Sequence, residues 1–149
     1  MGDKADLTVY AKLDQLDTVL GLVQKALSES TCPPKIQKKI LVCAEELFVN
    51  VVNYAYGSVP GKFTLELEIN DTDTGGQISI CMKDHGVPFD PLQHKTPELT
   101  ASAEDRKIGG LGIYMVRNIM DQISYEYLEQ KNIVRMTKKW QSQDDKYGR

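Results

Sequence analysis

Hydrophobic residues along the chain switch between a two-residue spacing and a helical spacing several times. Alternating, β-rich stretches predict five strands, over 7–13, 63–69, 77–83, 124–128 and 133–137. The final two are expected to form a hairpin that turns around Lys131 and Asn132. Apolar residues at helical spacing predict three helices: one capped by Asp14 and ending near Ser30, one over 35–55 and one over 113–120.

The order of these elements predicts the fold class. One strand, two helices and two strands are followed by a long connection, a helix and two strands. This order favours an α+β two-layer sandwich, in which a mixed, mostly antiparallel β-sheet carries helices on one face. The connection, 84–112, is rich in Gly, Pro and charge, and loops of this length are often functional. We expect a single domain over 1–140 and a disordered tail over 141–149.

Composition excludes several classes of partner and compartment. The chain has 149 residues and a net charge of −3, without the basic excess of a nucleic-acid binder. Its three cysteines include no Cys-x-x-Cys pair, which favours a reducing compartment over a disulfide framework or a zinc site. No apolar run approaches the ~18 residues of a membrane span, and the polar start is unlike a signal peptide. A cytoplasmic protein without nucleic-acid or membrane partners is therefore expected.

A polar stripe marks the helix predicted over 35–55. Glu46, Asn50 and Asn53 fall within about 60° of one another around the helix axis, because positions i, i+4 and i+7 share a face. On spacing alone, solvated surface residues explain the stripe as well as a site does. A site would be chemically sensible, since a carboxamide oxygen suits Mg²⁺ and a carboxylate one turn away can accept a proton.

Glycine turns lie at both ends of the long connection. At the first, Asp84 ends a strand and can point a carboxylate into a pocket, while Gly86 lets a flat ring approach the backbone; a plain turn has the same composition. Free amides at the start of a helix bind anions, so the second turn could hold phosphate, although a flexible hinge explains it too. The second turn consists of Gly109, Gly110, Leu111 and Gly112.

The conjunction of these motifs is more specific than each motif alone. Glu46-x-x-x-Asn50, then Asp84-x-Gly86, then Gly109-Gly110-x-Gly112 resembles the GHKL ATPase family, which includes gyrase, histidine kinases and mismatch-repair MutL proteins. The first glycine turn, extended as Asp-x-Gly-x-x-Phe-Asp-Pro, and residues 109–121 are most similar to the bacterial anti-sigma-factor serine kinases. The resemblance extends from the first strand to Trp140.

This resemblance implies ATP and Mg²⁺ as ligands and assigns roles to named positions. Asp84 would accept a hydrogen bond from the adenine amino group, and Gly86 would give the ring room. Asn50 would hold Mg²⁺ and Glu46 would act as general base. Arg106 and Lys107 could reach the terminal phosphate or be solvated lid charges. The full set of implied nucleotide-binding positions is Asn50, Asn53, Asp84, Gly86, Arg106, Lys107, Gly109, Gly110, Leu111 and Gly112.

The resemblance also implies a function. An anti-sigma factor of this type uses Mg-ATP to phosphorylate an anti-anti-sigma protein on serine, binds a sigma factor and regulates it by partner switching; a homodimer is an expectation for the family. Val51, Tyr54 and Pro88 depart from the wider family pattern, and Pro88 matches the serine-kinase branch. The alternative is a non-catalytic ATP-binding module, whose nucleotide-ordered lid gates a protein interface.

Overall fold

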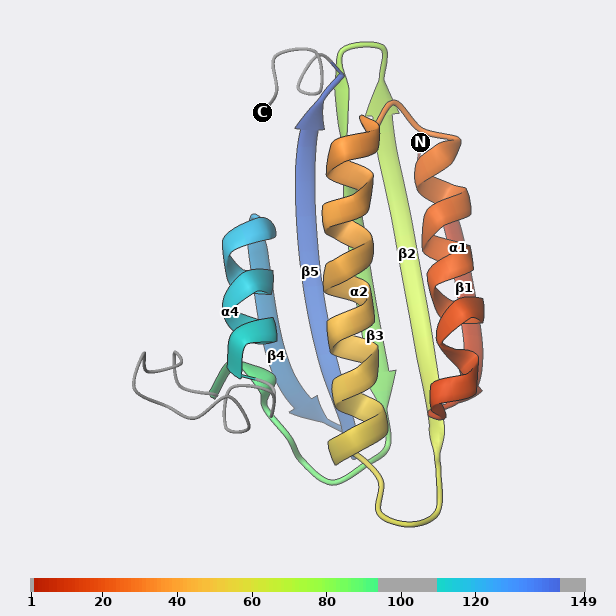
Figure 1. Ribbon diagram of the computed structural model, residues 1–149, viewed down its shortest axis with the longest axis vertical. Coiled ribbons are helices and arrows are strands. Elements are labelled where there is room, and N and C mark those ends of the chain that lie inside the picture. Colours follow the sequence, from red (N-terminus) through yellow and green to blue (C-terminus); the bar gives the residue numbers. More distant parts are fainter. Residues whose placement is uncertain (1, 94–109, 143–149) are drawn as a thin grey trace.

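A five-stranded sheet carries helices on one face in the computed structural model, which describes residues 2–93 and 110–142 (Figure 1). Helix α2 lies across the middle of the sheet, between α1 and α4. The principal elements are β1 (Asp3–Tyr10), α1 (Leu16–Ser28), α2 (Pro34–Tyr54), β2 (Lys62–Thr72), β3 (Gly75–Asp84), α4 (Gly110–Ile119), β4 (Gln122–Leu128) and β5 (Lys131–Gln141).

The strand order is β1-β2-β3-β5-β4. The predicted α+β sandwich is confirmed, and the described strand pairs are all antiparallel, so no mixed pairing occurs among them. Because β5 inserts between β3 and β4, the end of β3 lies beside the start of β5. In this register Asp84 is directly opposite Asn132.

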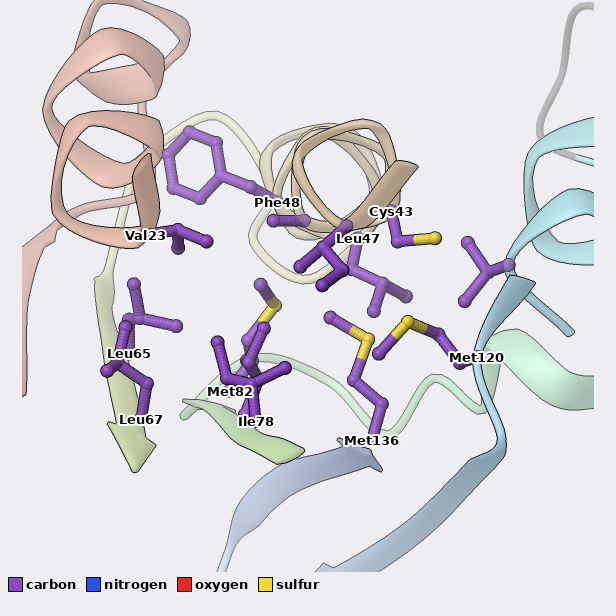
Figure 2. Close-up of a cluster of buried hydrophobic side chains, with 14 of the residues drawn as sticks. Val23, Cys43, Leu47, Phe48, Leu65, Leu67, Ile78, Met82, Met120 and Met136 are labelled. Carbon is purple, nitrogen blue, oxygen red and sulfur yellow. The ribbon is translucent and has the colours of Figure 1, made fainter. Parts of the chain in front are cut away.

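The hydrophobic core lies between the sheet and the helices (Figure 2). Alternate residues of β2 point inward, which is the pattern that the sequence predicts for a strand with one buried face. Within it, the rings of Phe48 on α2 and Phe63 on β2 meet edge to face with centroids 4.9 Å apart. The core fixes α2 firmly against β2 and β3, so a polar side chain on the buried side of α2 is held in place.

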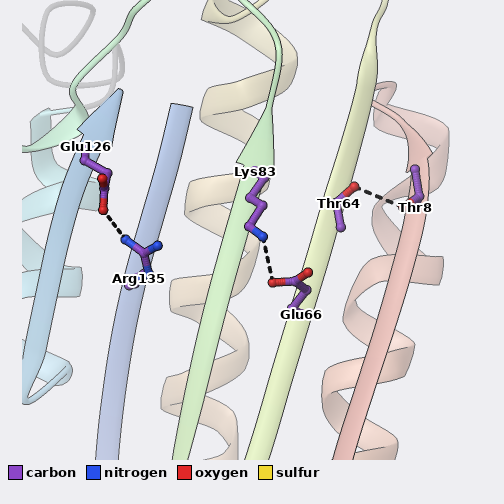
Figure 3. A network of polar contacts seen from close by, with 6 residues as sticks. All are labelled: Thr8, Thr64, Glu66, Lys83, Glu126 and Arg135. Atoms are coloured by element: carbon purple, nitrogen blue, oxygen red, sulfur yellow. Dashed lines mark hydrogen bonds and ion pairs between the residues drawn. The ribbon is translucent and has the colours of Figure 1, made fainter. Parts of the chain in front are cut away.

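The opposite face of the sheet is polar. Cross-strand partners include Thr8 with Thr64, at 3.0 Å, and Lys83 with Glu66, at 3.1 Å (Figure 3). Arg135 and Glu126 form a further ion pair on the same face. Exposed pairs of this kind contribute little stability. Because these polar pairs lie on the face opposite the helices, that face of the sheet is open to solvent.

Two local features differ from those predicted. The last hairpin turns at Glu129 and Gln130, whose φ angles of 53° and 62° suit a two-residue turn, and not at 131–132. Asn132 is therefore a paired strand residue. Asp14 does not cap α1: it lies in a short 3₁₀ turn, Leu13–Gln15, and α1 follows without a side-chain cap.

The ends of the chain also differ slightly from expectation. β1 starts at Asp3 and ends at Tyr10, because its whole length pairs with β2. β5 continues to Gln141, one residue beyond the predicted domain end, and the rest of the predicted tail from 143 lies outside the described residues. None of the helices in the described part of the chain has the length and apolar character to cross a membrane.

Candidate functional site

A small cavity lies between α2 and the inner side of β3 and β5. Its volume is about 20 Å³, room for about one water molecule. Apolar side chains make up most of the wall, with Phe89 and Pro91 contributed by the loop after β3. Three polar residues also line it: Asn50, Asp84 and Asn132. They are the three buried polar residues of the described chain, so its buried polarity converges on one point.

Asp84 is the last residue of β3, and only one of its two carboxylate oxygens accepts hydrogen bonds from described residues. Its side chain is 5% exposed. Oδ1 accepts hydrogen bonds from the backbone N–H of Gly86, at 2.9 Å, and from Nδ2 of Asn132, at 2.8 Å. Burial raises the pKa of Asp84, and these two hydrogen bonds oppose the rise. Among the described residues none donates to Oδ2, so Asp84 offers a free acceptor at the cavity.

Asn132 is a site residue that the sequence patterns do not single out. Its Oδ1 accepts hydrogen bonds from the Phe89 backbone N–H, at 3.0 Å, and from the Tyr125 hydroxyl, at 2.5 Å. Its Nδ2 donates to Asp84 and to the Val87 carbonyl, both at 2.8 Å. Asn132 thus ties the loop after β3 to β5. In the sequence, Asn132 stands where a turn is predicted. Its contact with Asp84 follows only from the register of β3 and β5.

Asn50 places a carboxamide on the buried side of α2. The residue is 6% exposed, and its side chain forms no hydrogen bond with another described residue. A buried polar group without a partner costs about 1–3 kcal/mol, so such a group is unusual unless it serves a ligand. A carboxamide oxygen is a suitable ligand for Mg²⁺, which needs few protein ligands because it keeps several waters. The Asn50 side chain therefore fits the metal implied by the resemblance.

Glu46 lies one turn before Asn50 on α2 and rests against the start of α4. A Cβ atom added to Gly112 would overlap the Glu46 carboxyl group. Burial raises the pKa of Glu46, and the neighbouring charge of Glu45 raises it further. In the parts of the chain described, nothing forms a hydrogen bond or ion pair with this carboxylate. The structure thus brings the predicted base and the second glycine turn together.

The second glycine turn is the first turn of a helix. α4 begins at Gly110, three residues earlier than predicted, so Gly110, Leu111 and Gly112 contribute backbone amides to its N-terminus. The first four amides of a helix have no partner inside it and favour anions. Gly109 and the predicted phosphate-contacting residues Arg106 and Lys107 lie outside the described residues.

The two remaining predicted positions have other surroundings. Gly86 packs against the end of α2: an added Cβ would overlap the Ala55 carbonyl group, which accepts a hydrogen bond from the Val87 N–H at 2.8 Å. This contact alone requires a glycine, and the role of Gly86 toward a ring stays a prediction. Asn53 is exposed and does not line the cavity, so the structure does not bring it together with Asn50.

The fold and this cavity define a class of ATPase, which comparison with known proteins identifies. The family model described as the histidine kinase-like ATPase domain matches residues 9–138, and the chain belongs to this family. The predicted resemblance to the GHKL ATPases is thereby confirmed.

Curated relatives carry the names of kinases. The serine-protein kinase RsbW of Listeria innocua is 29% identical over 143 residues, covering 93% of this chain and 88% of the relative. The serine/threonine-protein kinase BtrW of Bordetella bronchiseptica is 27% identical over 103 residues, covering 69% of this chain and 70% of the relative. The predicted similarity to anti-sigma-factor serine kinases is consistent with these names.

A solved structure supports the fold. The RsbU and RsbW domains of Rv1364c from Mycobacterium tuberculosis align with a TM-score of 0.60 at 14% identity. The alignment covers 91% of this chain and 32% of that one, so this chain spans about a third of its length.

Proposed function

We propose that this chain is a protein-serine kinase and anti-sigma factor, which uses Mg-ATP to phosphorylate an anti-anti-sigma protein and also binds a sigma factor. The observation that carries the proposal is the convergence of Asn50, Asp84 and Asn132 on one cavity, where an amide and a carboxylate oxygen lack partners among the described residues. The kinase names of the curated relatives support the same reaction.

The adenine would bind at the cavity through Asp84. A carboxylate oxygen that only accepts hydrogen bonds is complementary to the 6-amino group of adenine, which donates them. The cavity holds only about one water molecule in this form. Adenine can therefore enter only if the loop carrying Phe89 moves away from α2. Phe89 stacks on the ring of Tyr54 with centroids 5.1 Å apart, and this contact is expected to open.

The phosphates would lie between α2 and α4. The Asn50 carboxamide would hold Mg²⁺, and the ion would neutralise charge on the phosphate oxygens. Within the described ranges no cluster of three His, Cys, Asp or Glu side chains is arranged for a metal, so the phosphates and waters would supply most ligands. The amides of residues 110–112 would bind phosphate oxygens at the helix N-terminus. Arg106 and Lys107 are proposed to reach the terminal phosphate.

Glu46 would take the proton from the attacking serine. The serine oxygen forms a bond to the terminal phosphorus, the bond from that phosphorus to ADP breaks, and the serine proton passes to the Glu46 carboxylate. A base works best when its pKa lies near the working pH, and burial raises the pKa of Glu46 in that direction. Phosphoryl transfer otherwise depends on positioning and charge stabilisation, which the metal and the helix amides provide.

A phosphotransfer assay with the anti-anti-sigma partner tests this proposal. Glu46→Gln should keep ATP affinity within a few-fold and lower the transfer rate by roughly 10²–10⁴, the usual value of a positioned base. Asn50→Ala should lose Mg²⁺-dependent ATP binding as well. Glu29→Gln is the matched control, because Glu29 is exposed after the end of α1, lines no part of the cavity and should leave transfer unchanged.

Two outcomes would redirect the proposal. Wild-type transfer rates in Glu46→Gln would show that Glu46 is not the base. A wild-type chain that binds Mg-ATP tightly but phosphorylates no partner would favour the non-catalytic module, in which the nucleotide orders a lid and gates a protein interface. The residues of that lid between 94 and 109 lie outside the described residues.

A further inference from the structure

We propose that Asn132, held in orientation by Tyr125, is a positioning residue that makes this site select purines with a 6-amino group over purines with a 6-oxo group. The inference rests on the proposed binding of a nucleotide at this cavity and goes beyond it, because it concerns how the base is discriminated. Asn132 acts through Asp84 and is not itself expected to touch the reacting atoms.

The hydrogen bonds of Asn132 determine which side-chain atom is the oxygen and which is the nitrogen. One end meets the Phe89 backbone N–H at 3.0 Å, a group that can only donate. That end must therefore be the oxygen, and the Tyr125 hydroxyl donates to the same atom at 2.5 Å. The other end must be the NH₂ group, which has two protons for its two acceptors, Asp84 Oδ1 and the Val87 carbonyl.

This orientation determines what Asp84 can offer a base. Oδ1 already has two donors, the Gly86 N–H and the Asn132 amide, so the carboxylate is held with Oδ2 available. A carboxylate held in this way only accepts hydrogen bonds. It matches a 6-amino group, which donates, and opposes a 6-oxo group, which is a second acceptor. Sites built to hydrogen-bond one group reject an analogue that leaves their buried polar atoms unpaired.

Asn132 is built into the sheet in a way that suits this role. It is 3% exposed and lies opposite Asp84 across the β3–β5 pair, so the backbone ladder fixes the distance between the two side chains. Tyr125, on β4, supplies the outer end of the hydrogen-bond chain. Three neighbouring strands thus hold one carboxylate, and the loop that covers the cavity is tied to the same amide.

The test compares dissociation constants for Mg-ATP and for Mg-inosine triphosphate, whose base carries a 6-oxo group. The wild type should prefer ATP by roughly 10- to 100-fold, the range expected for one charged hydrogen bond. In Asn132→Leu this preference should fall by about tenfold, through weaker ATP binding, while affinity for inosine triphosphate stays within about threefold. A purely structural role for Asn132 would weaken both nucleotides equally and leave the ratio unchanged.

A second variant provides the same test if Asn132→Leu does not fold. Tyr125→Phe removes one hydroxyl and should lower the ATP preference in the same direction, by about two- to fivefold, because one donor to the amide oxygen is lost. Tyr127→Phe is the matched control: Tyr127 is on the same strand, 43% exposed, with no hydroxyl hydrogen bond to a described residue. It should leave the ratio unchanged.

The outcomes separate this inference from the proposed function. An unchanged ratio in Asn132→Leu, or in Tyr125→Phe where the first variant does not fold, would overturn the role of Asn132. A wild type that binds both nucleotides equally would overturn it as well and leave nucleotide binding intact. A wild type that binds neither nucleotide would instead overturn the proposed function.

Discussion

Replacing Asp84 with asparagine should separate nucleotide binding from folding stability. In the wild type, Oδ1 accepts hydrogen bonds from the Gly86 N–H and the Asn132 amide. The side-chain oxygen of an asparagine can accept the same two hydrogen bonds. The Asp84→Asn variant therefore keeps the internal hydrogen bonds of the loop. The substitution replaces only Oδ2, an acceptor, with an NH₂ group that donates hydrogen bonds and faces the cavity.

The expected loss of binding follows from that one contact. A hydrogen bond to a charged group contributes about 1.5–3 kcal/mol, which corresponds to about 10- to 150-fold in affinity. An NH₂ group facing the adenine amine also places two donors together, so the loss should lie toward the upper end of the range. Binding through the phosphates and Mg²⁺ is unaffected, and residual ATP binding should remain.

The free energy of unfolding of Asp84→Asn should not fall with its ATP affinity. Burial raises the pKa of Asp84 above its ordinary value of 3.8, so the folded state holds this proton more tightly than the unfolded chain. Stability from such a group is complete below the unfolded pKa and is lost as pH rises through the folded pKa. The wild type therefore loses stability as the pH rises above the unfolded pKa, whereas Asp84→Asn does not titrate and keeps its stability. Asp84→Asn should be at least as stable as the wild type at pH 7, and the gap should narrow as pH falls toward 4.

Calorimetric titration with Mg-ATP and thermal unfolding at several pH values measure the two effects. ATP affinity equal to that of the wild type would show that Asp84 does not read the base. A clear loss of stability at pH 7, with Gly86 and Asn132 unaltered, would show that the negative charge itself holds the loop.

Further predictions concern helix glycines and a buried thiol. Gly112→Ala should displace the Glu46 carboxyl group and lower phosphotransfer, although alanine favours the helix by about 1 kcal/mol. Gly21→Ala is its control: an added Cβ meets nothing within 4 Å there, so unfolding free energy should rise by about 0.5–1 kcal/mol with transfer unchanged. Burial raises the pKa of Cys43 to about 12, so maleimide should label Cys43 at pH 8 only after denaturant unfolds the chain; rapid native labelling would contradict its burial.

Most of the helices and strands, and several of the site residues, could be predicted from local sequence patterns. Hydrophobic spacing is a local property, and it located α2 and β3 to within two residues of their observed ends. Turn chemistry is local too, so Asp84 and the glycines of 110–112 could be singled out from their neighbours. The choice of Asn50 relied on helical spacing from Glu46, and the structure places Asn50 on the buried side of that helix.

The remaining site residues are brought together by long-range packing of the sheet. Asn132 lies 48 positions after Asp84, and the two meet because β5 inserts beside β3 in one particular register. Such pairing depends on the packing of the whole sheet and leaves no local trace, since asparagine at a strand start looks like a turn residue. Gly86 shows the same limit. Its need for glycine arises from the close approach of the carbonyl of Ala55, the residue after α2, which the neighbours of Gly86 in the sequence do not indicate.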